Sequence, residues 1–382
     1  MSIKVPFLDL RSQHAEIEAD LTRVLQGVIR SGQFIGGPRL LALEEAISGY
    51  TGARHSIGVS SGTDALMASL MALNIGHGDL VVTTVYSFFA TAGVVARLGA
   101  TPVFLDINPE TYNVDPERLS EWLERDVARR QRVKAIIPVH LFGQCAEMQP
   151  ILDLANTHGI AVVEDAAQAF GARYPFSGRL AHAGTLGTLG CLSFHPTKNL
   201  GAMGDGGMVL TNDDGLADKL RQLRDHGSRP KYHHAIIGGN FRLDAIQAAV
   251  LLVKLSHVDA WQARRQEHAA YYDEHLKVDG LITPRADFGR NCHVYNPYVV
   301  SVPEHRDELR QWLSIHGVET QIYYPVPFHA QPCFADLKYA SGDFPHAEHA
   351  AGHALALPVY PELTSAMQDH VIERIHAFYR QA

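Results

Sequence analysis

Residues 189–212 read LGCLSFHPTKNLGAMGDGGMVLTN, two apolar runs joined by a glycine-rich turn that carries a single lysine. The turn is too short to hold the crossover helix that a parallel pair of strands requires, so the second run is predicted to be an antiparallel strand in the same sheet. Five earlier apolar runs alternate with helix-period segments, which is typical of a sheet buried on both faces. These runs occupy 55–61, 80–87, 101–107, 134–142 and 159–167. The sequence therefore predicts an α/β fold with a mostly parallel seven-stranded sheet.

A different pattern begins after residue 255 and predicts a smaller α+β domain packed on the first. No low-complexity linker separates the two parts, so we expect a large domain over 1–255 and a small one over 256–382 that meet at a helix rather than a flexible hinge. The elements expected in the small domain are a long helix at 257–276, a strand at 293–302, a helix at 306–317, a strand at 318–327 and two terminal helices.

Composition narrows the classes of protein. Charged residues make up 19% of the 382 residues, the formal net charge is −8, and no basic run is long enough to follow a phosphate backbone, so a nucleic acid partner is not expected. The start of the chain lacks the apolar core of a signal peptide, and no apolar run is long enough to cross a bilayer. The four cysteines form no C-x-x-C pair, which argues against a zinc site and a disulfide framework. We expect a soluble, cytoplasmic protein.

Polar residues at the ends of the predicted strands are the first candidates for a site, because open parallel sheets gather ligands at the carboxyl ends of their strands. The turn SSGTD at 60–64 joins a strand to a helix and could direct backbone N–H groups at a phosphate, or serve as an ordinary helix cap. Glu164 and Asp165 close another strand, where an acid must be paired or solvated. Their alternative role is also a helix cap.

Lys198 is the third candidate, and Ser193 lies five positions before it at the end of an apolar run. A lysine beside a partly desolvated pocket can lose its proton near neutral pH and attack a carbonyl. Taken alone, such a lysine is more often solvated on the surface. The phosphate turn, the acid at the strand end and the lysine together describe what pyridoxal 5'-phosphate requires: a phosphate cradle, a carboxylate for the pyridine nitrogen and an amine for the aldehyde.

The chain resembles the DegT/DnrJ/StrS family of nucleotide-sugar aminotransferases, which have the aspartate aminotransferase fold (fold type I). Each motif is weak by itself, but the ordered set spans nearly the whole chain. The matching stretches are FLDLRSQ (7–13), SSGTDAL (60–66), EDAAQ (164–168), SFHPTK (193–198), GAMGDGG (201–207), GGNFRLDAIQAA (238–249) and ALPVYPEL (356–363).

The resemblance implies a role for individual residues. Lys198 matches the lysine that forms a Schiff base with the cofactor and moves a proton during transamination, and Asp165 matches the acid that pairs with the pyridine nitrogen. Relatives that dehydrate instead of transaminating carry a histidine at the position of Lys198. The other implied cofactor contacts are Gln168 near the phenolic oxygen, Gly62, Thr63 and Ser193 at the phosphate, Asn240 reaching the phosphate from the neighbouring subunit of a homodimer, and Phe88 stacked on the ring, although Phe89 could take that place.

The same resemblance implies a nucleotide-linked keto sugar, UDP- or dTDP-linked, as amino acceptor and L-glutamate as donor, leaving 2-oxoglutarate, in amino-sugar or cell-surface polysaccharide synthesis. The segments around Arg242 and Tyr324 resemble members that aminate C3 of a 3-keto sugar, and Lys231 and His233 are further candidates for substrate contacts. Many such relatives have histidine where this chain has Tyr323. Arg242 could instead pair with Asp225 or Asp244, and amination at C4 or a non-catalytic regulatory role are the alternatives.

The histidines at 346, 349 and 353 share one face of a predicted helix with Glu348 beside them. Metal sites are built from such groups, but the family has an ordinary amphipathic helix at this position, so no metal is expected. His195 is either a spacer in the lysine motif or part of the site, and Cys191 is read as a small buried hydrophobic residue.

Overall fold

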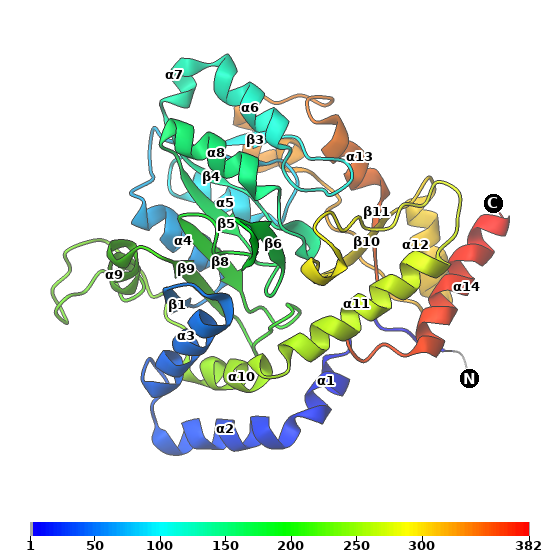
Figure 1. Cartoon of the computed structure of the whole chain (residues 1–382), viewed down its shortest axis with the longest axis horizontal. Coiled ribbons are helices and arrows are strands. Elements are labelled where there is room, and N and C mark those ends of the chain that lie inside the picture. The colour runs from blue at the N-terminus through cyan, green and yellow to red at the C-terminus, as the bar shows by residue number, and fades with distance from the viewer. Residues whose placement is uncertain (1–2, 382) are drawn as a thin grey trace.

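The computed structural model describes residues 3–381 and contains the predicted seven-stranded sheet (Figure 1). All seven apolar runs form strands, in the spatial order β1-β9-β8-β5-β4-β2-β3. Strand β9 runs antiparallel to both of its neighbours, as the short glycine-rich turn predicted, and the other pairs are parallel. The strands are β1 (His55–Val59), β2 (Leu80–Thr84), β3 (Thr101–Leu105), β4 (Val133–Ile137), β5 (Ala161–Asp165), β8 (Leu189–Ser193) and β9 (Gly207–Thr211).

The register of the central strands determines where the site can form. Asp165 at the end of β5 pairs with Cys191 of β8, so the next residues of β8 extend past the end of β5. Ser193, the last residue of β8, lies opposite Gly207 of β9. The polar residues that end β5 and β8 therefore lie at one edge of the sheet.

Helices cover both faces of the sheet, which is why its strands are almost entirely apolar. One face packs against α4 (Gly62–Ala72), α5 (Ala90–Arg97) and α9 (Asp214–Leu223). The opposite face packs against α3 (Pro38–Thr51), α6 (Pro116–Arg125), α8 (Met148–His158) and α10 (Ala245–Leu255). The first helices, α1 (Leu10–Glu16) and α2 (Glu18–Ser31), lie outside this layer, where α2 packs on α10, and the short α7 (Val127–Arg130) follows α6.

The C-terminal part is built on α11 and a two-stranded antiparallel sheet. Its elements are α11 (Val258–His275), β10 (Tyr298–Ser301), α12 (Arg306–Ile315), α13 (Pro345–His353), β11 (Ala354–Leu357) and α14 (Ser365–Gln381). Short 3-10 turns occur at η1 (Leu141–Gly143), η2 (Arg290–Cys292), η3 (Phe328–Ala330) and η4 (Pro332–Leu337).

The prediction of a strand at 318–327 is wrong. Only single bridges form there, Val318 with Val5 and Gln321 with Ala356, and the partner of β10 is β11. Two prolines at 325 and 327 lack the N–H groups that a strand ladder needs. The sequence pattern also missed the hairpin of β6 (Arg173–Phe176) and β7 (Arg179–His182), which forms a separate two-stranded sheet.

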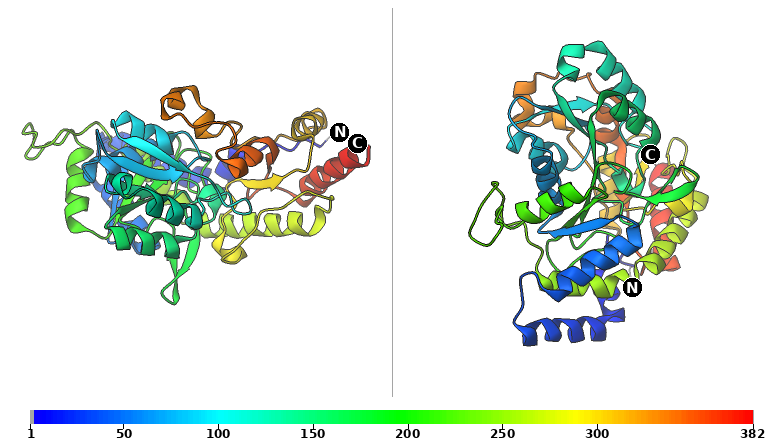
Figure 2. Two further views of the ribbon diagram at one scale, coloured as in Figure 1. Left: turned by 90° about the horizontal axis from the view of Figure 1, so that it is seen from above. Right: turned by 60° about the vertical axis from the view of Figure 1, so that its left-hand side comes forward.

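The predicted domain boundary at 255/256 falls between α10 and α11 and stays a prediction. Val5 packs in the hydrophobic cluster of the C-terminal part, so the start of the chain belongs with that part in space. The left view of Figure 2 accordingly shows the first segment of the chain near α14, the last helix. Residues 3–381 contain no helix that combines the length and apolar composition needed to cross a bilayer.

Candidate active site

A cavity of roughly 680 Å³ lies between the ends of the central strands, the start of α4 and the C-terminal part. Its lining residues come from elements that are far apart in the sequence, including Phe7 near the start and Val359 near the end. Eight of the twelve residues proposed from the sequence line this cavity: Gly62, Thr63, Phe88, Asp165, Gln168, Ser193, Lys198 and Tyr324.

The start of α4 presents backbone N–H groups to the cavity. The side chain of Ser61 caps the helix by accepting a hydrogen bond from the Asp64 N–H at 3.0 Å. Gly62 packs so tightly on β8 that a Cβ atom would lie 2.7 Å from Cβ of Ser193. The free N–H groups of the first turn and the Ser193 hydroxyl therefore surround a space suited to a phosphate group.

Asp165 is held at the bottom of the cavity. Its carboxylate accepts hydrogen bonds from the Thr91 hydroxyl at 2.8 Å and from the Ala167 N–H at 3.2 Å. Burial raises the pKa of Asp165 above its ordinary value, and these hydrogen bonds and the charge of Lys198 only partly offset that effect. A buried carboxylate in this setting favours a cationic partner in the cavity. Sequence reasoning missed Thr91, since nothing in its own segment distinguishes it.

Glu164 points away from the cavity, because consecutive strand residues face opposite sides of a sheet. It is fully buried and accepts hydrogen bonds from the N–H groups of Gly184, Leu186 and Gly187 at 2.6 to 2.8 Å. His140 Nε2 lies 2.8 Å from the same carboxylate. Because His140 Nδ1 accepts from a backbone N–H, its Nε2 carries the proton and donates to Glu164. Glu164 thus anchors β5 to the turn before β8, and is not a helix cap.

Lys198 lies in the loop between β8 and β9 and lines the cavity half-buried. Burial lowers the pKa of Lys198 to about 8, and the negative charge of Asp165 opposes this shift. The loop is closed by a hydrogen bond from the Lys198 N–H to the carbonyl of His195 at 2.9 Å. An appreciable fraction of Lys198 is therefore neutral and nucleophilic near neutral pH. His195 also lines the cavity, with Nδ1 3.0 Å from the Thr197 hydroxyl.

The aromatic residues of the cavity divide by position. The side chain of Phe88 lines the cavity, is 58% exposed, and lies 6.2 Å from the ring of Tyr324. Phe89 instead packs on Phe334, with ring centroids 5.8 Å apart. This arrangement favours Phe88 as the aromatic residue available to a ligand in the cavity.

Tyr324 brings the C-terminal part into the site. Its hydroxyl accepts a hydrogen bond at 2.9 Å from Nε2 of Gln168, whose Oε1 accepts from the N–H of Phe142. The backbone around Tyr324 is fixed by Tyr86, whose hydroxyl donates to the carbonyl of Tyr323 at 2.7 Å and accepts from the N–H of Tyr324 at 2.8 Å. Tyr86 was not foreseen from the sequence, and neither was Arg265, the arginine among the cavity-lining residues.

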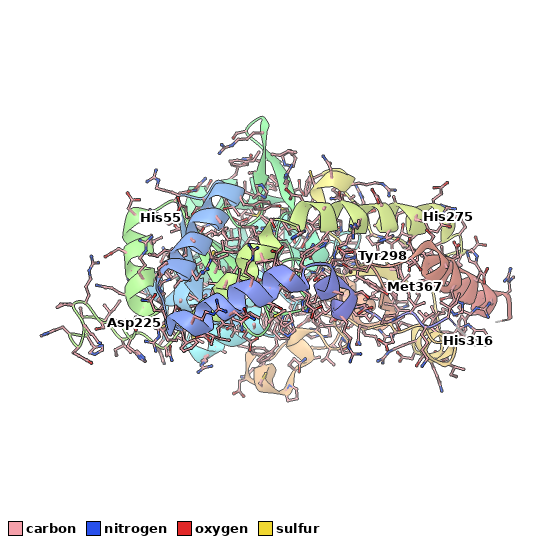
Figure 3. All side chains as sticks on the ribbon, turned by 90° about the horizontal axis from the view of Figure 1, so that it is seen from below. His55, Asp225, His275, Tyr298, His316 and Met367 are labelled. Carbon is pink, nitrogen blue, oxygen red and sulfur yellow. The ribbon has the colours of Figure 1, made fainter. Side chains whose placement is uncertain are left out.

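The four remaining predicted residues, Lys231, His233, Asn240 and Arg242, do not line this cavity. The chain forms a loop after α9 that projects from the body (Figures 1 and 2), and the exposed Lys231 and His233 belong to it. Asn240 and Arg242 lie at the base of this loop, where Asn240 bridges to Asp225 and Arg242 bridges to Val59 of β1. Arg242 pairs with Asp225 at 2.6 Å, the structural alternative that the sequence left open. Figure 3 shows Asp225 at the end of the molecule opposite His275 and His316 of the C-terminal part.

The predicted histidine cluster has other contacts. The rings of His349 and His353 stack at 3.8 Å, and Glu348 bonds to His329 at 3.0 Å. Within the described range 3–381, no group of three His, Cys, Asp or Glu side chains is arranged to hold a metal ion.

The sequence model of the DegT/DnrJ/EryC1/StrS aminotransferase family matches residues 15–376. The chain belongs to this family. It is 48% identical over 99% of both chains to a protein of Geobacillus stearothermophilus named pleiotropic regulatory protein. It is 43% identical to the UDP-2-acetamido-2-deoxy-3-oxo-D-glucuronate aminotransferase of Pseudomonas aeruginosa, over 95% of this chain and 97% of that one. The crystal structure of S. venezuelae DesV with a ketimine intermediate covers 99% of both chains with 38% identity and a TM-score of 0.92.

Family membership confirms the predicted fold type, the aminotransferase activity and the cofactor, pyridoxal phosphate. The described residues fit this cofactor. The close packing of Gly62 on Ser193 leaves the first turn of α4 open to a phosphate, and the buried Asp165 carboxylate calls for a cation such as a protonated ring nitrogen. Lys198 provides an amine whose lowered pKa suits it to attack an aldehyde.

Proposed function

We propose that Lys198 is the catalytic lysine of this aminotransferase and that Asp165 tunes the cofactor. When bound, pyridoxal phosphate supplies an electron sink for the carbanion that forms as a proton leaves the amino donor. Lys198 moves that proton, since its amine reaches the cavity and loses its own proton at a pKa of about 8. Asp165 would keep the ring nitrogen of the bound cofactor protonated, and Phe88 would cover the ring and exclude water, since both side chains line the cavity.

The substrates that we propose are L-glutamate as donor and a nucleotide-linked 3-keto sugar as acceptor. The observation that carries this proposal is the 43% identity, over nearly the full length, to an enzyme named for a UDP-linked 3-oxo sugar. Tyr324 would contact the sugar, because it lines the cavity and is fixed on both sides by Gln168 and Tyr86. Amination at C4 of a 4-keto sugar is the alternative, and a place in amino-sugar or cell-surface polysaccharide synthesis follows from either.

The functional unit that we propose is a homodimer with shared active sites. Asn240 is exposed and does not line the cavity of its own chain, and it bridges to Asp225 at the base of the loop that follows α9. In a dimer this loop could bring Lys231 and His233, and its base could bring Asn240 and Arg242, to the cavity of a second copy. Large apolar side chains exposed at the first helices, including Ile29, Ile35 and Leu41, offer a surface for such a contact. A cytoplasmic location fits the four free cysteines.

A regulatory function is the second candidate, because a relative 48% identical is named as a regulatory protein. A regulatory protein that binds the cofactor but catalyses no reaction would show the cofactor's visible absorbance band. Adding glutamate would not change that band. The aminotransferase predicts that glutamate shifts the band, as the amino group passes to the cofactor.

The test of the substrate proposal uses the cofactor-loaded protein, 15N-glutamate and a panel of UDP- and dTDP-linked 3-keto and 4-keto sugars. We expect a product with 15N on C3, located by NMR, and none from the Lys198→Ala variant. Nitrogen on C4 would replace the 3-keto proposal with the 4-keto one. If glutamate shifts the absorbance band but no sugar is aminated, glutamate remains the proposed donor. The proposal of a UDP- or dTDP-linked keto sugar as acceptor would then be overturned.

A further inference from the structure

A second lysine, Lys254, is buried behind the site. It lies near the end of α10, is only 1% exposed, and does not line the cavity. Its ammonium donates a hydrogen bond to the carbonyl of Gly201 at 2.8 Å. A buried ammonium is costly unless it is paired or hydrogen-bonded, so this contact requires a structural or functional reason.

Gly201 belongs to the loop that carries Lys198. The loop is compact, since a Cβ on Gly201 would lie 2.3 Å from the carbonyl oxygen of Pro196. Asn199, between Lys198 and Gly201 in the sequence, is itself buried and donates to the carbonyl of Val294 at 3.2 Å. The loop is therefore attached to the body at two points, Asn199 and Gly201, while Lys198, directly before them in the sequence, lines the cavity.

The charge nearest in effect to Lys254 comes from the C-terminal part, from Glu362, which forms no ion pair with it. Burial lowers the pKa of Lys254 to about 8, and the negative charge of Glu362 opposes this shift. The Glu362 carboxylate is enclosed, and neither oxygen has a hydrogen-bond partner among the described residues. Arg265, whose positive charge favours the ionised form of Glu362, donates to the carbonyl of Val359, and both Arg265 and Val359 line the cavity. The hydrogen bond to Gly201 is therefore the direct contact through which the Lys254 ammonium can act on the loop of Lys198.

We propose that Lys254 is a positioning residue for Lys198. Its ammonium fixes the Gly201 carbonyl, which limits the movement of the loop and keeps the amine of Lys198 directed into the cavity. Lys254 does not line the cavity, so it would act on Lys198 through the Gly201 carbonyl that it holds. The inference rests on the proposed role of Lys198.

The test compares the Lys254→Met variant with the wild-type protein, each measured with and without the cofactor. Methionine keeps the length and the apolar stem of lysine but cannot donate a hydrogen bond to Gly201. Losing a charged hydrogen bond should speed hydrogen exchange of the 194–206 peptide by about tenfold or more and leave the peptide of β5 unchanged. The rate of the single-turnover reaction with glutamate should fall by a similar factor. The affinity of the protein for pyridoxal phosphate should stay unchanged. Lys254→Arg, which keeps a cationic donor, should recover part of the rate.

Lys219→Met is the matched control, because Lys219 also donates to a backbone carbonyl, that of Ala72 at 2.7 Å, far from the loop. It should change neither exchange at 194–206 nor turnover. Unchanged loop exchange in Lys254→Met, or faster exchange everywhere, would overturn the proposal. If Lys254→Met does not fold, Lys254→Gln, whose shorter side chain cannot reach Gly201, replaces it with the same expected results. The hydrogen-exchange result does not depend on the chemical role of Lys198. If Lys198 is not the residue that binds the cofactor covalently, the Lys198→Ala variant will still capture the cofactor, and this outcome is seen separately.

Discussion

At the scale of single residues, two adjacent acids have different functions because they face opposite sides of β5. Asp165 faces the cavity, whereas Glu164 accepts hydrogen bonds from three backbone N–H groups and His140. Glutamine in place of Glu164 would put an NH₂ group against N–H donors. We expect Glu164→Gln to lower the free energy of unfolding by about 2–4 kcal/mol, measured by urea denaturation of the cofactor-free protein.

The control for this prediction is Glu121→Gln, which removes an exposed ion pair with Arg118 and should cost no more than about 0.5 kcal/mol. Asp165→Asn is the contrasting change, since it should lower turnover with little loss of stability. Equal losses of stability in the Glu164 and Asp165 variants would contradict the different roles of the two acids.

The second residue-scale prediction concerns pH. The pKa of Lys198 is lowered to about 8, so its proton leaves at a lower pH than that of a solvated lysine. Covalent capture of pyridoxal phosphate by the cofactor-free protein should therefore accelerate through about pH 8 and level off above it, because the amine attacks only when neutral. Stopped-flow absorbance between pH 6.5 and 9.5 measures this rate. A rate that still rises steeply at the upper limit would indicate a lysine with an ordinary pKa.

The identity of that lysine can be checked in the same samples. The pKa of Lys254 is also lowered to about 8, but Lys254 does not line the cavity. Borohydride reduction followed by peptide mapping should find the cofactor on Lys198 alone. Cofactor found on Lys254 would contradict the assignment of the cavity as the site.

At the scale of elements, the start of α4 depends on its contact with the end of β8. A Cβ on Gly62 would lie 2.7 Å from Cβ of Ser193, so alanine would push the helix start away from the strand. We expect Gly62→Ala to weaken pyridoxal phosphate binding by about 10- to 100-fold, because the helix N–H groups and the Ser193 hydroxyl would no longer converge. Gly49 of α3 has open space around its Cβ direction. Gly49→Ala should leave the affinity unchanged, and equal losses in both variants would contradict the phosphate cradle.

The sequence could predict the sheet because each of its strands is a short apolar run with distinct ends, and because the turn at 194–206 excludes a crossover. It could not predict that β11, rather than 318–327, pairs with β10. The segment of β11 continues directly from α13, so its four buried residues look like part of a helix. The local sequence pattern does not show which distant segment supplies the hydrogen bonds to a strand such as β10.

The same limit applies to the site. Residues in recognisable turns, such as Gly62, Asp165 and Lys198, could be proposed from the sequence and do line one cavity. Thr91 and Tyr86 could not, since their contacts with Asp165 and Tyr324 are separated by 74 and 238 residues. Whether each cavity residue has its proposed role is decided by the variants described above.

At the scale of the whole molecule, one chain supplies the cavity and Lys198, but its exposed Asn240, at the base of the loop after α9, does not line that cavity. If a second copy supplies Asn240, two inactive variants should complement each other. In a mixture of Lys198→Ala and Asn240→Ala, half of the dimers are mixed, and each has one site with both residues intact. Co-expression should then restore about a quarter of the wild-type activity per chain. The control is the co-expression of Lys198→Ala with Asp165→Asn, which should restore no activity. Both residues line the cavity of the same chain, so every site in a mixed dimer lacks one of them. A mixture no more active than the mean of its two components would contradict shared sites, and would require each chain to complete its own cavity.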